Sequence, residues 1–253
     1  MLFSEYCLTP DIFSTEAYET PSLSGLGDVP RRELCEERCR AHLRNLEVIL
    51  SNECALVQNL WNGTWDQFVN KKVQARYRGT KAILKNLKRQ GRLVKVGGCK
   101  NRKPSTELEW CQEAFDSHQQ HLVTGIIASE EVKLTSGFQN ELIVGSIGSL
   151  LDEPPNWWGN CQSSVRLSRS LEDYRQHLKL IFRYSSFLMF IDPYLNPDKT
   201  EYCQFCELLA SIDTERNSNK DIKIEIHVSL SKLNPNQYRK GFKNLAIQLK
   251  ENL

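Results

Sequence analysis

The sequence contains no apolar run long enough to span a membrane as a helix. Its N-terminus also lacks the basic segment followed by an apolar segment that marks a signal peptide. These absences predict a cytoplasmic protein with no membrane partner. A quarter of the residues are charged and 40% are hydrophobic, and 253 residues suffice for one large domain or two ordinary ones. The composition is that of a globular chain with a buried core.

The chain also lacks a complete set of metal ligands. Its nine cysteines are an odd number in a sequence without an export signal, so we expect reduced thiols. Cys203 and Cys206 have the Cys-x-x-Cys spacing, but no second such pair or nearby histidine completes a zinc site. Cys111, His118 and His121 cluster without a recognised spacing. We therefore predict no metal and no cofactor.

Acidic residues are absent between Lys71 and Lys103, where the sequence has thirteen lysine or arginine residues. The rest of the chain carries 20 basic and 31 acidic residues, so the net charge of +2 hides one basic island, 71–103, in an acidic protein. Clustered lysine and arginine bind phosphate backbones by releasing counterions. The alternatives are a solvated helix face or a surface that pairs with the acidic remainder of the chain. We favour nucleic acid, DNA or RNA, as the partner.

Within the basic island, the pattern predicts a helix over 73–90, closed by Gly91, and a short strand over 92–96. A narrow apolar face is supplied by Ile83, Leu84 and Leu87. Four basic residues recur at i, i+4, i+7 and i+11, and they are the candidate nucleic-acid-binding residues: Lys81, Lys85, Lys88 and Arg92. A basic helix followed by a strand is compatible with the second half of a winged-helix module.

Three regions are expected along the chain. Residues 1–30, rich in Ser, Thr, Gly and Pro, predict an irregular arm, and residues 31–105 predict a helical, basic region that starts with a helix over 31–58. Residues 106–253 predict an α/β domain. Its expected strands are 122–128, 141–147, 187–191 and 222–228, and its expected helices are 107–121, 170–184, 200–212 and 236–253.

Trp157 and Trp158 lie in a proline-rich loop between two of these elements. A tryptophan pair of this kind either caps the edge of a core or offers a stacking platform for a base. We favour packing.

The apolar run Phe187 to Ile191 predicts the central strand of the chain, buried on both faces beside 122–128 and 141–147. The order strand, helix, strand predicts that it pairs in parallel with 222–228 through a right-handed crossover. Asp192 follows this strand and His227 ends the next one. The carboxyl ends of parallel strands are where ligands collect, so Asp192, Tyr194 and His227 are candidates for a phosphate-facing site. The alternatives are Asp192 bonded to nearby backbone N–H groups and His227 buried against a backbone carbonyl.

Several motifs between 122 and 253 resemble an uncharacterised bacterial group of phospholipase D-like proteins. They are Gly125-Ile-Ile-Ala-Ser, the Trp157-Trp158 loop, Tyr174, Phe190-Ile-Asp-Pro-Tyr-Leu-Asn-Pro197 and Ile224-Glu-Ile-His227. The resemblance implies a mixed sheet flanked by helices and a phosphodiesterase or nuclease activity on nucleic acid. It also implies that Asp192, Tyr194 and His227 line the catalytic site.

The signature that defines that family, His-x-Lys, is absent, because Val228 and Ser229 follow His227. In such enzymes the histidine attacks the phosphodiester and the basic partner holds the phosphate. We therefore expect an α/β fold, α+β overall, that is incomplete at its C-terminus and catalytically incomplete. The alternative is a non-catalytic nucleic-acid-binding or assembly module that could form a homo-oligomer.

Overall fold

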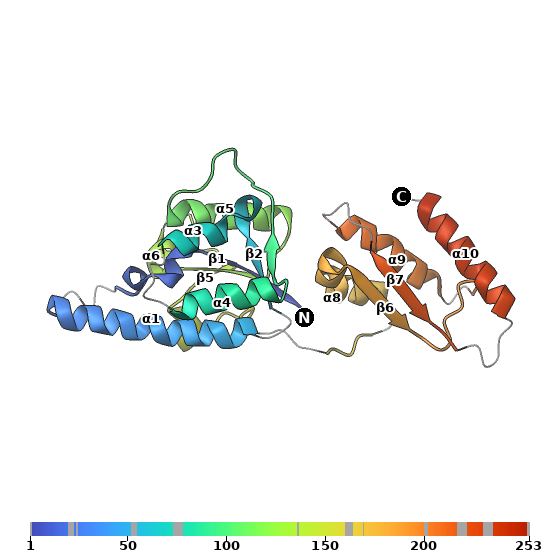
Figure 1. Cartoon of the computed structure of the whole chain (residues 1–253), viewed down its shortest axis with the longest axis horizontal. Coiled ribbons are helices and arrows are strands. Elements are labelled where there is room, and N and C mark those ends of the chain that lie inside the picture. The colour runs from blue at the N-terminus through green and yellow to red at the C-terminus, as the bar shows by residue number, and fades with distance from the viewer. Residues whose placement is uncertain are drawn as a thin grey trace. The chain divides into compact units, whose positions relative to one another are not determined.

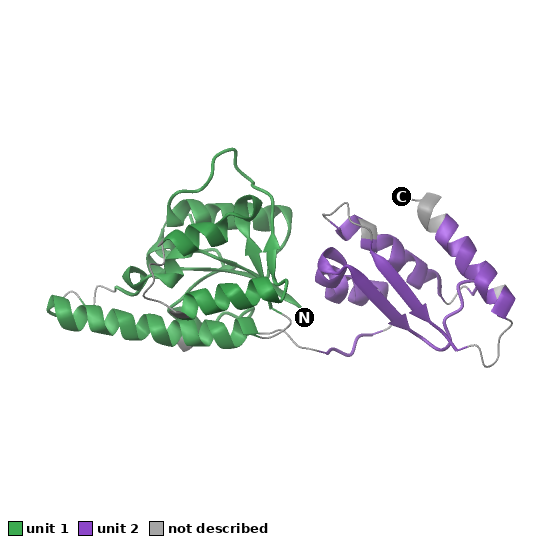
Figure 2. Ribbon diagram, in the orientation of Figure 1, with its two compact units in different colours: residues 1, 3–163 green, residues 2, 164–253 purple. Residues whose placement is uncertain are grey.

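The computed structural model describes residues 2–19, 23, 25–51, 55–72, 78–135, 137–159, 164–168, 170–199, 202–216, 222–229 and 235–251. Two compact units divide the chain: residues 1 and 3–163 form unit 1, and residues 2 and 164–253 form unit 2 (Figure 2). The division therefore falls between residues 163 and 164, not at 30 and 105. Among the described residues, no helix is both long enough and apolar enough to cross a bilayer.

Unit 1 contains a five-stranded sheet in the order β3-β2-β1-β4-β5 (Figure 1). The strands are β1 (Ser4–Leu8), β2 (Ala55–Asn59), β3 (Leu93–Lys95), β4 (Gly125–Ala128) and β5 (Val144–Ser146). Every described strand pair is parallel. The strand order reverses at β1, which pairs with β2 on one side and with β4 on the other. The α/β class predicted from the sequence is confirmed.

The central strand of this sheet lies in the region predicted to be an irregular arm. All five residues of β1 are buried, and two short 3-10 helices follow it, η1 (Pro10–Phe13) and η2 (Thr15–Tyr18). The prediction was wrong because β1 begins with two polar residues, Ser4 and Glu5, which interrupt the apolar pattern of a buried strand. Both polar side chains are buried in the folded unit.

The helices of unit 1 are α1 (Asp28–Ser51), α2 (Leu60–Gly63), α3 (Trp65–Lys72), α4 (Arg78–Arg89), α5 (Glu107–Gln120), α6 (Glu130–Leu134) and α7 (Ser149–Asp152). Figure 1 shows α1 and α4 on one face of the sheet and α5 on the opposite face. Gly91, at φ +66°, closes the turn after α4 and leads into β3, as predicted. The predicted helix over 31–58 is wrong beyond Ser51, because 55–59 form β2.

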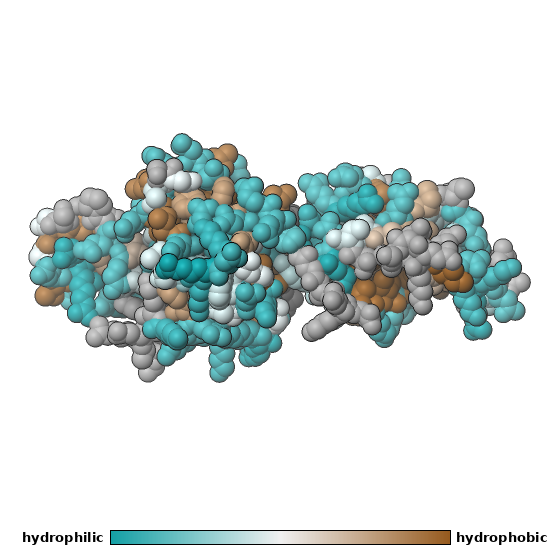
Figure 3. Space-filling model, turned by 90° about the horizontal axis from the view of Figure 1, so that it is seen from above, coloured by the Kyte–Doolittle hydropathy of each residue, from teal (hydrophilic) through white to brown (hydrophobic). Residues whose placement is uncertain are grey.

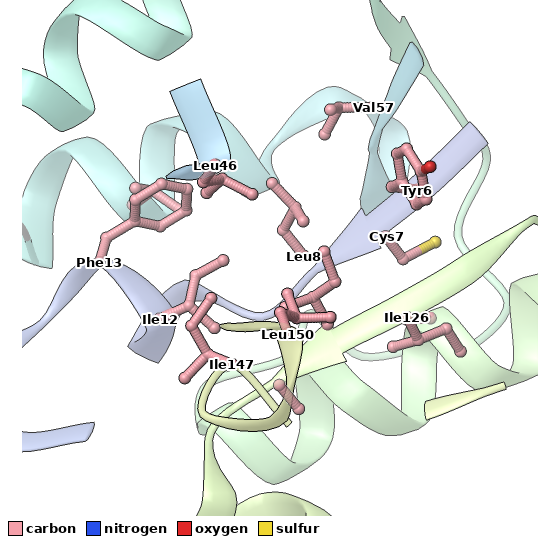
Figure 4. Packing of buried hydrophobic residues seen from close by; sticks show 14 of the residues in the cluster. Tyr6, Cys7, Leu8, Ile12, Phe13, Leu46, Val57, Ile126, Ile147 and Leu150 are labelled. Carbon is pink, nitrogen blue, oxygen red and sulfur yellow. The ribbon is translucent and has the colours of Figure 1, made fainter. Parts of the chain in front are cut away.

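The core of unit 1 lies between the sheet and its helices. Four side chains near the carboxyl ends of the strands point toward one another, namely Leu8, Ile12, Ile147 and Leu150 (Figure 4). The tryptophan pair packs at the edge of this core, as predicted. Trp157 covers Gly125 so closely that a Cβ there would come within 2.3 Å of the indole ring. Trp158 is 8% exposed and makes an edge contact with Tyr6.

Unit 2 pairs two parallel strands, β6 (Phe187–Ile191) and β7 (Lys223–His227), and contains α8 (Leu171–Tyr184), α9 (Cys203–Glu215) and α10 (Pro235–Glu251). Ser170 caps α8 by accepting a hydrogen bond from the Asp173 N–H at 3.2 Å. The predicted parallel pairing is confirmed. The prediction that 187–191 is buried on both faces beside β4 and β5 is wrong. Leu188 is 8% exposed whereas Ile191 is 73% exposed, and β4 and β5 belong to the sheet of unit 1.

Candidate nucleic-acid interface

Helix α4 presents three of the four predicted basic residues to solvent. Lys81, Lys85 and Lys88 are exposed, while the apolar side of the helix, formed by Ile83, Leu84 and Leu87, is at most 3% exposed. The apolar residues pack into the core of unit 1, and α4 lies against α1. The amphipathic pattern therefore fixes which side of α4 faces water.

Lys88 differs from the other two lysines because it has a carboxylate partner. Its ammonium group forms an ion pair with the buried carboxylate of Asp66. The same carboxylate accepts a hydrogen bond from Asn59 Nδ2 at 2.9 Å. Burial acts to raise the pKa of Asp66, but the hydrogen bonds from Lys88 and Asn59 outweigh it and the pKa is lowered. Lys88 thus stabilises the start of α3.

Arg92 does not belong to the exposed basic stripe. It is 6% exposed, and its Nη1 donates hydrogen bonds to the carbonyl oxygens of Leu50 at 2.5 Å and Ala55 at 3.2 Å. The i+11 spacing does not place it on the stripe because α4 ends at Arg89 and the chain turns at Gly91. Arg92 ties the end of α1 to the start of β2 instead of reaching solvent.

A second group of basic residues gathers where β2 and β3 end. β2 and β3 are parallel neighbours with Asn59 beside Lys95, so both strands deliver their carboxyl ends to the same edge. The β3–α5 loop, 96–106, follows directly and carries three basic residues, Lys100, Arg102 and Lys103. In the view of Figure 3, unit 1 shows hydrophilic residues interspersed with hydrophobic ones.

The segment α2, which follows β2, is a left-handed turn and not a regular α-helix. Trp61, Asn62 and Gly63 are consecutive residues with positive φ, at 48°, 59° and 78°. Positive φ is uncommon for Asn and a genuine outlier for a bulky residue such as Trp. The turn is held to the β3–α5 loop by two hydrogen bonds: Asn62 N donates to the Val96 carbonyl at 2.8 Å, and Trp61 Nε1 donates to the Lys100 carbonyl at 3.3 Å.

Helix α5 anchors the β3–α5 loop. The buried Glu113 carboxylate accepts a hydrogen bond from the Cys99 N–H at 2.7 Å, and the Lys100 ammonium lies 3.5 Å from the Asp116 carboxylate. Burial is the main cause that raises the pKa of Glu113. Burial, followed by the charge of Glu113, raises the pKa of the Cys99 thiol to about 11. The Cys99 thiol is therefore mainly protonated at neutral pH, which disfavours the reactive thiolate.

The edge where β1 and β4 end is the topological switch point of the sheet, where α/β proteins often bind ligands. Here Thr9 N donates to the Ile127 carbonyl at 2.9 Å, which extends the β1–β4 pairing beyond the strand. Asp11 is 8% exposed, and Glu130 adds an exposed carboxylate after β4. Lys133 directs its ammonium group to backbone carbonyls. The acidic character of this edge opposes phosphate binding.

The carboxyl ends of β6 and β7 bring the predicted catalytic residues to one rim of unit 2. Ile191 pairs with His227, and Asp192 N donates to the His227 carbonyl at 3.1 Å. The Asp192 carboxylate accepts a hydrogen bond from Tyr194 N at 2.8 Å, while His227 Nε2 lies 3.5 Å from Glu225. Tyr194 is 78% exposed. Asp192 therefore acts as a strand-ending carboxylate, and His227 is exposed instead of buried.

No group of three metal-ligating side chains gathers anywhere in the part of the chain that the structure describes. Cys203 and Cys206 both lie on α9. Sequence reasoning did not single out Trp61 as a candidate residue, nor Lys95, Lys100, Arg102 and Lys103 within the basic island. The signal that could have found them is the Asn-Gly pair after Trp61, which is typical of a left-handed turn, together with the basic run that follows.

Comparisons of the chain with protein-family models, with curated proteins and with solved structures find no match.

Proposed function

We propose that unit 1 binds nucleic acid through its basic island, without cleaving it. The observation that supports this proposal is a set of basic side chains without carboxylate partners at hydrogen-bonding distance. Within the described part of the chain, the ion pairs of the island go from Lys88 to Asp66 and from Lys100 to Asp116. None joins a described carboxylate to Lys81, Lys85, Lys95, Arg102 or Lys103.

This arrangement argues against the two alternative roles of the island. A surface that neutralises the acidic remainder of the chain would engage most of its lysines and arginines in ion pairs. A merely solvated helix face would account for the lysines of α4 alone, but basic residues also occur at the edge where β2 and β3 end. Unpaired cations on neighbouring elements suit contact with successive phosphates, which requires no base readout.

The direct test is charge reversal of Lys81 and Lys85 together. Lys81→Glu/Lys85→Glu should weaken binding of a labelled strand of about 20 nucleotides by about tenfold or more. The slope of log affinity against log salt concentration should shrink by about 1.5, because two phosphate contacts are lost. Fluorescence polarisation across a salt series measures both quantities. Lys88 is left unchanged, since a Glu there would face the buried Asp66 carboxylate.

The matched control is Lys240→Glu/Lys243→Glu, which makes the same charge change at two exposed positions on α10 of unit 2. It should leave affinity and salt slope within about twofold of the unchanged protein, since these two lysines lie outside the proposed interface and a nonspecific change of two surface charges is largely screened by salt. Equal losses in both double variants would contradict a specific interface on unit 1. Absence of binding at low salt would refute the proposed function.

A phospholipase D-like phosphodiesterase is the second candidate function. The observation that favours it is the pairing that delivers Asp192 and His227 to one rim. The side chains at this rim are less suited to phosphate binding. Glu225 places a negative charge beside His227, and the Asp192 carboxylate already accepts a hydrogen bond from the Tyr194 backbone N–H. A phosphoryl-transfer site needs basic groups that offset charge on phosphorus. We therefore place nucleic-acid binding by unit 1 first.

A further inference from the structure

Trp61 is set apart from the other tryptophans of unit 1 by its surroundings. Trp65 and Trp110 are fully buried, Trp158 is 8% exposed, and Trp157, although partly exposed, covers Gly125 and donates to the Leu142 carbonyl. Trp61 is also partly exposed and packs against the core, but it lies beside the basic β3–α5 loop. It is thus the aromatic ring that unit 1 offers at the end of β2, next to the basic residues of the β3–α5 loop.

The ring of Trp61 is supported on one side. A Cβ at Gly98 would lie 3.0 Å from Cδ1 and 3.1 Å from Nε1 of the indole, so the Gly98 backbone sits directly against it. The Lys103 ammonium lies 6.0 Å from the ring centroid, at the limit of a cation–π contact. A flat ring, backed by glycine and flanked by a cation, is suited to receive another flat group.

The backbone at Trp61 has a strained conformation, with φ at 48°. A non-glycine residue kept at positive φ is strained, and such residues persist only where their surroundings enforce them. At Trp61 the enforcement comes from its Nε1 bond to the Lys100 carbonyl and from Asn62 N, which donates to the Val96 carbonyl. A strained turn that fixes an aromatic ring beside a basic loop suggests that the ring has a role in binding.

Basic residues lie on the elements that position the ring, and the Lys103 ammonium is the one with a described contact to it. Lys95 lies along Gly63, where a Cβ would come within 3.1 Å of Lys95 Cγ. Lys100, Arg102 and Lys103 follow on the β3–α5 loop. An aromatic ring bordered by lysine and arginine can stack on a base while its neighbours contact the adjoining phosphates.

We infer that unit 1 prefers single-stranded nucleic acid, with Trp61 stacked on an unpaired base. The inference rests on the proposed binding function and narrows its ligand. In a duplex the bases are stacked on one another and are not open to a side chain, whereas an unpaired base of any identity has a free face. The phosphate contacts of Lys81 and Lys85 serve single and double strands alike.

The test compares Trp61→Ala and Trp61→Phe in the full chain, with a single strand of about 20 nucleotides and the matching duplex as probes. Trp61→Ala should weaken single-strand binding by about tenfold and duplex binding by less than about twofold. Trp61→Phe loses the Nε1 hydrogen bond but keeps a ring that can stack. It should therefore retain most of the single-strand affinity. Thermal unfolding of each variant establishes that it is folded.

The outcomes separate this inference from the function on which it rests. Single-strand loss confined to Trp61→Ala supports stacking. Equal loss in Trp61→Ala and Trp61→Phe, on both probes, would mean that Trp61 only anchors the β3–α5 loop, and the inference would be overturned. Unchanged binding in both variants would overturn it too, while the effect of Lys81→Glu/Lys85→Glu would keep the proposed function intact. Failure of the unchanged protein to bind either probe would refute both.

Discussion

At the scale of single residues, the same charge has different roles within a short stretch of chain. Lys81 and Lys85 face water, Lys88 neutralises a buried carboxylate, and Arg92 is enclosed by backbone carbonyls. Helical spacing predicted the exposure of the three lysines correctly. It was wrong for Arg92, because Gly91 turns the chain out of the helix before that residue. A periodicity argument is valid only as far as the helix extends.

Arg92→Ala should destabilise unit 1 without acting on the interface. The change leaves the carbonyl groups of Leu50 and Ala55 without a buried donor. We expect the free energy of unfolding to fall by about 2–4 kcal/mol. Urea denaturation followed by circular dichroism measures the change. Lys81→Ala, at an exposed position, is the control and should stay within about 0.5 kcal/mol of the unchanged protein. Equal stability of the two variants would show that Arg92 has no structural role.

At the scale of elements, helices were easier to predict than strands. The helix α5 begins with a capping box in which Thr106 and Glu109 bond to each other's backbone N–H groups, a signal that lies within four residues. The strand β1 carries no comparable local signal, since its burial depends on β2 and β4, which are far away in sequence. The apolar run Phe187 to Ile191 also predicts a strand without telling whether helices cover one face of that strand or both.

The candidate site shows the same limit. Lysines on α4 could be predicted from a local pattern, whereas the group formed by Trp61, Lys95 and Lys103 depends on the pairing of β2 with β3. That pairing brings together residues from two strands and a loop. The rim formed by Asp192 and His227 was predicted correctly because the strand, helix, strand order fixes parallel pairing in a short stretch. The order of strands and helices did not predict which groups contact these two side chains, namely the Tyr194 backbone N–H for Asp192 and the Glu225 carboxylate for His227.

The contact between β4 and Trp157 gives a test of the sheet of unit 1. Gly125→Ala would place a Cβ 2.3 Å from the indole of Trp157, a ring fixed by its Nε1 hydrogen bond to the Leu142 carbonyl at 2.9 Å. We expect a loss of about 2–3 kcal/mol in the free energy of unfolding, from overpacking. Gly79→Ala, on α4 with no atom within 4 Å, should instead stabilise by about 0.5–1 kcal/mol. Urea denaturation should show a lower free energy of unfolding for Gly125→Ala and a higher one for Gly79→Ala. A Gly125→Ala variant as stable as the unchanged protein would contradict the close packing of Trp157 on β4.

At the scale of the whole molecule, charge and core are divided unequally between the units. Unit 1 has 19 basic and 20 acidic residues by sequence, yet thirteen of the basic ones lie in the island 71–103. Outside the island, this unit is therefore strongly acidic, which concentrates its attraction for polyanions on one region. Each unit has a hydrophobic core of its own. That of unit 2 contains six buried hydrophobic residues among those described, far fewer than that of unit 1.

This division predicts that residues 1–163 fold and bind nucleic acid by themselves. Expressed alone, they should unfold cooperatively and bind a single strand within about threefold of the full-chain affinity, since the proposed contacts all lie in unit 1. Fluorescence polarisation measures binding, and thermal unfolding measures folding.

The same two proteins, the full chain and residues 1–163, also separate the candidate functions. If the rim with Asp192 and His227 cleaves nucleic acid, the full chain should show cleavage and residues 1–163 should not. His227→Ala in the full chain should then abolish cleavage. Binding that survives in residues 1–163 without cleavage in any preparation assigns function to the basic island, whereas a folded but non-binding 1–163 would place the interface elsewhere.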